Sequence, residues 1–252
     1  MDVKQPGQET IEPAAASWAA GGVSALERGL AVLDALGAAG EPVPLAELSR
    51  RTGLYKSTLL RLLASLERCR YAVRQTDGRY RLGPVVLQLG HAYARGFDLR
   101  AALEPALTRL AAQTREAASF FLREGDGRLC LARVEGRQEV RDWVTVGSML
   151  PLQGAAGHLL RAFEGGYSPS VPLVYASFGE RTPEVAAVSA PVFRNGSRLA
   201  GALTISGTCT RFRDDAHRSA MTTALLQEAE LLTRELDGDV SGFLALRQGR
   251  DG

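Results

Sequence analysis

Five side chains that can hydrogen-bond to DNA lie within seven residues of one another, at the start of a segment with helical periodicity. They are Tyr55, Lys56, Ser57, Thr58 and Arg61. The leucines of this segment recur three and four residues apart, at Leu59, Leu62, Leu63 and Leu66. Because those leucines must face a core, the polar group is left on the outward, N-terminal part of the helix. Lysine and arginine donate to guanine or phosphate, hydroxyls reach phosphate, and a threonine methyl meets thymine, so the pattern predicts a helix that reads DNA.

Three arginines flank the turn signal Asp77-Gly78 that follows this segment. By the two-residue period of a strand, Arg79 and Arg81 share a face, and we expect Arg74 near them across the turn. Such a ribbon suits contact with phosphates or with the minor groove. Two alternatives stay open: both surfaces are merely solvated, or the unit contacts a protein instead of DNA.

The elements that must position these side chains have the order of a winged helix-turn-helix. Helices are expected at residues 24–39 with Ser24 as the cap, at 45–52 with Gly53 at the end, and at 55–69, before a hairpin at 71–82. Ten Arg and Lys accompany six Asp and Glu between residues 24 and 83, whereas residues 84–252 carry 19 of each. The positive excess coincides with the predicted DNA-binding unit, as phosphate contact favours, although a few charges also separate by chance.

The rest of the chain changes from helical to strand periodicity near residue 118. Two helices are expected at 85–94 and 99–115, and we expect them to connect the basic N-terminal module to the neutral C-terminal one. Strands are expected at 119–123, 128–134, 139–146, 171–176, 186–193 and 199–207, and further helices at 153–163 and 214–236. This order predicts an antiparallel sheet covered by helices on one face. The expected parts are a disordered leader at 1–22, a winged helix-turn-helix at 23–83, a linker helix at 84–98, a sheet domain at 99–240 and a tail at 241–252.

The sequence shows no cluster of metal ligands and no catalytic motif. The three scattered cysteines are Cys69, Cys130 and Cys209. They predict neither a zinc site nor a disulfide framework, and they favour a reducing cytoplasm. No phosphate-binding loop or hydrolase elbow is present, no apolar run has the length of a membrane span, and no signal-peptide pattern begins the chain. We expect a cytoplasmic protein without cofactor, metal or catalytic residues; a hydrolase or transferase and a protein-binding scaffold are the alternatives.

Short motifs in a constant order resemble those of the IclR family of bacterial transcription regulators. They are residues 24–30 (SALERGL), 45–48 (LAEL), 53–54 (GL), 56–58 (KST), 61–63 (RLL), 80–83 (YRLG), 150–152 (LPL), 179–181 (GER), 190–192 (APV) and 204–207 (TISG). The resemblance covers nearly the whole chain after residue 23. It implies an α+β fold with an N-terminal winged helix-turn-helix, a connecting helix and a C-terminal GAF-like antiparallel sheet with helices. It also implies a homodimer or tetramer that acts on a double-stranded DNA operator in response to a small metabolite, often a carboxylate or an aromatic acid.

The resemblance further places an effector pocket between the sheet and the helix after the Leu-Pro-Leu motif. Carried over by position, its residues are Trp143, Leu150, Ala156, Gly157, Ser177, Val185, Ala187, Thr204 and Ser206. Backbone N–H groups at the start of the 153–163 helix favour an anion, and Thr204 and Ser206 offer hydroxyls on one face of their strand. Arg141 or Arg181 can pair with a carboxylate. The alternative is that the small residues only pack helix against sheet and that both arginines make surface ion pairs.

The chain departs from the family pattern at three places. Arg70 stands where glycine is usual at a helix end, which predicts a strained or differently built turn. Tyr55 replaces a frequent proline at a helix start. Relatives carry a longer helical stretch between Phe163 and Val171, where this chain has only residues 164–170. Since that stretch covers one side of the pocket, we expect a more open pocket, or a C-terminal domain that serves only oligomerisation or protein contact.

Overall fold

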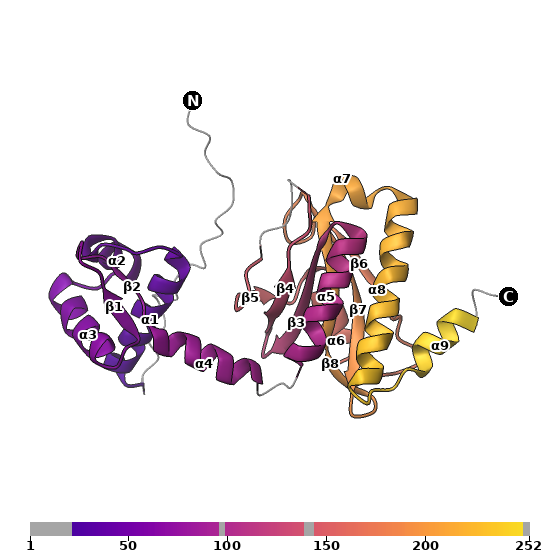
Figure 1. Cartoon of the computed structure of the whole chain (residues 1–252), viewed down its shortest axis with the longest axis horizontal. Helices are drawn as coiled ribbons and strands as arrows, with labels where there is room; N and C mark the ends of the chain where they lie inside the picture. The colour runs from indigo at the N-terminus through magenta and orange to yellow at the C-terminus, as the bar shows by residue number, and fades with distance from the viewer. Residues whose placement is uncertain (1–21, 96–98, 139–143, 249–252) are drawn as a thin grey trace. The chain divides into compact units, whose positions relative to one another are not determined.

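The computed structural model describes residues 22–95, 99–138 and 144–248, which fall into two compact units divided after residue 96 (Figure 1). The elements of the N-terminal unit are α1 (Ser24–Ala39), α2 (Leu45–Thr52), α3 (Lys56–Arg68), β1 (Ala72–Arg74), β2 (Tyr80–Leu82) and α4 (Pro84–Arg95). Its core is built from Val32, Leu36, Val43, Leu48, Leu59, Leu63, Ala72 and Tyr80. The helix-turn-helix and the hairpin lie where the sequence predicts them. The predicted role of Ser24 is wrong, because the N-cap of α1 is Val23 and no described side chain caps the helix.

A short turn between α2 and α3 sets where the second helix begins. Gly53 ends α2 in the left-handed conformation, with φ of 68°, which costs a glycine little. The Ser49 hydroxyl donates to the backbone oxygen of Leu54 at 2.7 Å. The Thr52 hydroxyl accepts from the Leu54 N–H at 3.3 Å. These bonds hold the first residues of α3 at the end of a rigid turn.

The connection from α3 to the hairpin contains the unusual Arg70. Its φ is 61°, so an arginine occupies the left-handed conformation that glycine tolerates best. The prediction of a strained turn is confirmed by this angle. Gly83, just after β2, packs against the same turn: a β-carbon there would lie 2.2 Å from the backbone oxygen of Arg70. Glycine at position 83 is therefore what lets the chain pass so close to Arg70.

The C-terminal unit is a six-stranded antiparallel sheet with helices, so the predicted α+β class is correct. Its strands are β3 (Ala117–Glu124), β4 (Gly127–Val134), β5 (Met149–Pro151), β6 (Tyr175–Phe178), β7 (Val185–Arg194) and β8 (Arg198–Thr208), in the order β5-β4-β3-β8-β7-β6. Its helices are α5 (Arg100–Thr114), α6 (Gly154–Ala162), α7 (Cys209–Phe212), α8 (Asp215–Glu235) and α9 (Ser241–Gln248). The strand expected at 139–146 is wrong in its described part, since residues 144–146 are not in a strand and the edge strand is β5. The strand expected at 171–176 is displaced toward the C-terminus, since β6 begins only at Tyr175.

Helices cover both faces of this sheet, not one as predicted. In β7 and β8 nearly every residue is buried in succession, and a strand with one face in water would alternate. In Figure 1, α5 and α8 lie side by side along one face, and α6 also packs on β6, β7 and β8. The Ala155 N–H of α6 reaches Ser177 of β6, whereas the Thr233 hydroxyl of α8 accepts from the Phe193 N–H of β7.

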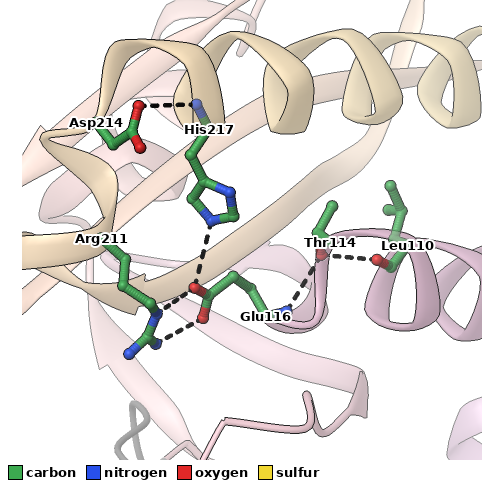
Figure 2. A network of polar contacts seen from close by, with 6 residues as sticks. All are labelled: Leu110, Thr114, Glu116, Arg211, Asp214 and His217. Carbon is green, nitrogen blue, oxygen red and sulfur yellow. Dashed lines mark hydrogen bonds and ion pairs between the residues drawn. The ribbon is translucent and has the colours of Figure 1, made fainter.

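A buried carboxylate joins three elements of this unit (Figure 2). Glu116, between α5 and β3, has a side chain that is 0% exposed and accepts from Arg211 of α7, with Nε at 2.5 Å and Nη2 at 2.7 Å. His217 of α8 places its Nε2 at 3.6 Å from the same carboxylate. Because a buried charge is tolerated only when it is paired, this network ties α7 and the start of α8 to the end of α5.

Residues 241–248, expected to belong to a tail, form α9. The N–H of Ser241 donates to the Asp239 carboxylate at 2.8 Å, and Phe243 is 3% exposed against the core of the unit. Each described helix is too short or too polar to reach across a lipid bilayer.

Candidate nucleic-acid interface

Helix α3 is anchored by one face and open on the other. Leu59 and Leu63 are at most 1% exposed in the core, whereas Tyr55, at the N-cap, is 84% exposed. No acidic residue lies in the first turn. The N-terminal end of a helix carries a partial positive charge, so this end favours a phosphate.

The outer face of α3 differs in detail from the predicted one. Ser57 and Arg61 are exposed and four residues apart, which puts them on one face as predicted. Thr58 is only half-buried and lies toward the core side, so it belongs to the flank. The same spacing brings Leu60 and Ala64 onto the outer face, both exposed, with Leu60 at its edge on the side away from Arg61. We call Ser57, Leu60, Arg61 and Ala64 the reading face; helical periodicity applied to the whole segment would have found its two apolar members.

The cations of α3 are uncommitted within the described structure. Lys56 and Arg61 are exposed, and their side chains make no hydrogen bond or ion pair to any described residue. Helix α2 shows the contrast: Glu47 holds Arg50 and Arg51 at 2.6 and 2.7 Å. The hydrogen bonds from Arg50 and Arg51 lower the pKa of Glu47 to about 2. Of the cations on α2 and α3, Lys56 and Arg61 are therefore the ones left available for phosphate.

The register of the hairpin separates the three arginines. Arg81 pairs with Val73, whereas Arg74 pairs with Tyr80, whose side chain is in the core. Residues directly opposite in a ladder share a face, so Arg74 lies on the opposite face from Arg81. Its guanidinium stands 5.8 Å from the centre of the Tyr80 ring. The expectation that Arg74 joins the other two arginines is therefore wrong.

Arg79 and Arg81 are exposed on the outer side of the ribbon. Arg79 Nε lies 3.4 Å from an Asp77 carboxylate oxygen, and both side chains are more than half exposed. Such a solvated pair is worth little and breaks easily in favour of a phosphate. Arg81 donates to the backbone oxygen of Leu82 at 3.2 Å.

A second candidate site is a hollow on the α6 side of the sheet in the C-terminal unit, with a volume of about 400 Å³ that includes its open mouth. Five of the predicted effector residues line it: Ser177, Val185, Ala187, Thr204 and Ser206. The other lining residues are Phe121, Arg128, Val144, Gly154, Ala155 and Arg181. Strand pairing explains the grouping, because Ser177 pairs with Ala187 and Ala187 with Ser206 across three strands. The hollow is small, and its lining combines a mainly apolar wall with three hydroxyls and two arginines.

Three predicted effector residues do not line this hollow, and a fourth is not described. Ala156 is 0% exposed in the core, and a β-carbon on Gly157 would lie 2.3 Å from the backbone of Leu152, so both serve helix packing. Leu150, in β5, pairs with Arg128 at the sheet edge. Trp143 lies outside the described residues, as does Arg141.

The start of α6 is already occupied by the protein's own oxygens. The Ala155 N–H donates to the Ser177 hydroxyl at 2.9 Å, and the Gly154 N–H donates to the Glu180 carboxylate at 3.2 Å. His158 Nε2 also lies 2.6 Å from that carboxylate. The expectation of an anion site on these N–H groups is therefore wrong. The polar side chains that line the hollow include Arg128, whose Nε donates to the Pro151 backbone oxygen at 3.1 Å, Arg181, Ser206, and Thr204, whose hydroxyl is shared with Ser189 at 2.8 Å.

No metal site is found in the described parts of the chain, where no three His, Cys, Asp or Glu side chains converge. His158 lies beside Glu180 and Arg161, without a hydroxyl or thiol nucleophile bonded to it among the described residues.

Two family models match the chain, one in each unit. A model of the IclR helix-turn-helix domain matches residues 25–76, and a model of the bacterial transcriptional regulator IclR C-terminal domain matches residues 91–167. Together they cover just over half of the 252 residues. The second match ends within residues 164–170, the stretch expected to be shorter than in relatives.

Curated relatives and solved structures agree with these models. The HTH-type transcriptional regulator KipR of Bacillus subtilis is 27% identical over 202 residues, covering 68% of this chain and 81% of KipR. XynR of Escherichia coli is 26% identical over 246 residues, covering 85% and 97%. The Thermotoga maritima IclR structure has a TM-score of 0.69 at 20% identity, covering 84% of this chain and 98% of that one. An IclR homolog from Microbacterium hydrocarbonoxydans complexed with 4-hydroxybenzoate has a TM-score of 0.71 at 20% identity, covering 85% and 99%.

Proposed function

The chain belongs to the IclR family of bacterial transcription regulators, and we propose on that premise that its N-terminal unit binds a specific DNA operator through the reading face of α3. The outer side of the β1–β2 ribbon contacts the flanking backbone. In this geometry α3 enters the major groove and the ribbon follows phosphates.

One observation carries the proposal: Lys56 and Arg61 project from an anchored helix without a partner in the described structure. Solvated helix faces usually engage their basic residues in pairs three or four residues apart, as α2 does with Glu47. Helix α3 has no acidic residue in its first turn to play that part. Exposed cations at a positive helix end fit a polyanion.

Selection of bound sequences from random duplexes, followed by affinity measurement, tests this function. We expect a preferred half-site, and Arg61→Ala should weaken binding to it by about 1–3 kcal/mol while lowering the preference at one base pair. Arg213→Ala is the control, since this exposed arginine lies in the C-terminal unit. The absence of any preferred sequence, or an unchanged affinity in Arg61→Ala, contradicts the proposal.

We also propose that the hollow of the C-terminal unit binds a small anionic effector, such as a carboxylate. The lining contains Arg128 and Arg181, and no Asp or Glu contributes to it among the described residues. The family neighbour complexed with 4-hydroxybenzoate supports an aromatic acid as one ligand to try.

Calorimetry with small aliphatic and aromatic carboxylates tests the effector. We expect at least one carboxylate to bind with measurable heat. Ser206→Val should lower its affinity at least tenfold, because Ser206 lines the hollow and valine removes the hydroxyl. Neither heat nor a thermal shift across the panel would support the alternative, in which this unit serves only oligomerisation or protein contact.

We propose a homo-oligomer as the DNA-binding form. Operators of helix-turn-helix dimers consist of two half-sites about one helical turn apart, so the selected sequence should repeat with that spacing. Light scattering on the whole chain checks the stoichiometry, and a monomer on a single half-site would contradict it.

A further inference from the structure

Two apolar side chains, Leu60 and Ala64, lie on the reading face, where water would favour polar ones. Leu60 is 47% exposed and Ala64 is also exposed. They lie four residues apart, so they form one strip along α3. Leu62 and Leu66 of the same helix pack against the N-terminal core, whereas Leu60 is not part of that cluster. The Leu60 side chain therefore lies outside the N-terminal core.

The surroundings of the strip indicate the kind of surface it meets. Ser57 and Arg61 lie beside the strip on the reading face. Lys56 lies at its N-terminal edge, and Arg68 lies one helical turn after Ala64; all four residues are exposed. The net positive charge of α3 favours an anionic partner surface. The major groove offers the matching mixture, with acceptors on guanine and adenine next to the apolar C5-methyl group of thymine.

Resting on the operator binding proposed above, we infer that Leu60 and Ala64 contact thymine methyl groups and so specify thymine under the middle of α3. Ser57 and Arg61 bond the neighbouring base edges or phosphates. The apolar strip supplies the part of the specificity that hydrogen bonds alone do not give, because only thymine among the four bases carries this methyl group.

Replacing thymine by deoxyuridine tests the inference, since it removes only the methyl group and keeps every hydrogen-bonding atom. In the selected operator, each thymine is replaced in turn and the dissociation constant is measured by fluorescence anisotropy at one salt concentration. At one or two positions per half-site we expect wild-type affinity to fall about fourfold for each lost methyl contact. Leu60→Asn should bind the thymine and deoxyuridine duplexes equally at those positions, and Leu60→Met should still discriminate.

Because Leu60 is half exposed, these variants keep the fold, which their thermal unfolding checks. No deoxyuridine effect at any position, or the same effect in Leu60→Asn as in the wild type, would overturn the inference while leaving operator binding intact. A preferred half-site without thymine would also overturn it. A selection that yields no preferred sequence refutes the proposed function itself, so the two failures are distinguishable.

Discussion

Among single residues, the arginines of the hairpin show what a strand pattern predicts and where it stops. The two-residue period correctly puts Arg79 and Arg81 on the outer side. It cannot place Arg74, because that depends on which residue of the other strand it pairs with, and the register pairs it with the buried Tyr80. Which face an arginine occupies across a turn therefore depends on the register between the two strands and not on the period of its own strand alone.

This difference makes a prediction for two matched variants. Arg79→Ala should weaken binding to specific and unrelated duplexes about equally and lower the salt slope by about one, because Arg79 meets phosphate and not a base. Arg74→Ala should leave both quantities nearly unchanged, since its guanidinium lies over Tyr80 on the other face. Equal losses in the two variants would show that the ribbon docks differently. The measurement is affinity against salt concentration on both duplexes.

Glu47 gives a prediction of pH dependence. Its pKa lies at about 2 because of the hydrogen bonds from Arg50 and Arg51, against 4.5 for an ordinary glutamate. A carboxyl whose pKa falls on folding stabilises the fold above the higher value, and that contribution is lost as pH falls toward the lower one. Glu47→Gln should therefore lower the unfolding temperature of the N-terminal unit at pH 7 and have a much smaller effect near pH 2. A difference as large at pH 2 as at pH 7 would contradict the pairing, and NMR titration of the carboxyl measures the pKa directly.

At the level of elements, local periodicity predicts most of the fold and long-range pairing supplies the rest. Helices α1, α2, α3 and α8 and the long hairpins follow from spacing and turn residues. The edge strand β5 does not, because three residues carry too little pattern and their pairing with β4 decides the matter. The Glu116–Arg211 pair joins residues 95 apart, so no sequence window contains it. The hollow beside α6 is predicted only in part for the same reason. Pairing between strands brings its serines together as expected, whereas the contact of Glu180 with the start of α6 joins residues 26 apart and has no sequence signal.

The close passage of the hairpin end past α3 predicts a large effect of one methyl group. A β-carbon at Gly83 would lie 2.2 Å from the Arg70 oxygen and 2.9 Å from the Tyr71 carbonyl carbon, so the backbone must move. Gly83→Ala should destabilise the N-terminal unit by about 1–3 kcal/mol. Gly90→Ala is the control, because a β-carbon there meets nothing within 4 Å and alanine favours the helix. Urea unfolding of both variants measures the difference; equal midpoints would refute the tight contact.

For the whole molecule, the two units have different electrostatic character. The ten cations and six anions between residues 24 and 83 give the DNA-binding unit its positive charge, whereas residues 84–252 are balanced. This distribution attracts DNA to the N-terminal unit, whereas the hollow proposed to bind an anion lies in the balanced part of the chain. The proposed operator binding and the proposed effector response therefore belong to separate units of one chain.

If an anion in the hollow controls operator binding, the control must be reciprocal. A ligand changes operator affinity only through a different affinity for two conformations of the protein, so the operator must change ligand affinity by the same factor. We expect a factor of about 5–150, the usual range of such coupling. Calorimetry of the same carboxylate against the free protein and against the protein saturated with operator measures one side of the cycle, and anisotropy with and without carboxylate measures the other.

Ser206→Val should reduce the ligand effect on DNA binding while leaving ligand-free operator affinity unchanged. A ligand effect on DNA binding that Ser206→Val leaves unchanged would mean that the carboxylate acts at the DNA interface itself, as a competitor for Lys56 and Arg61, rather than through the hollow.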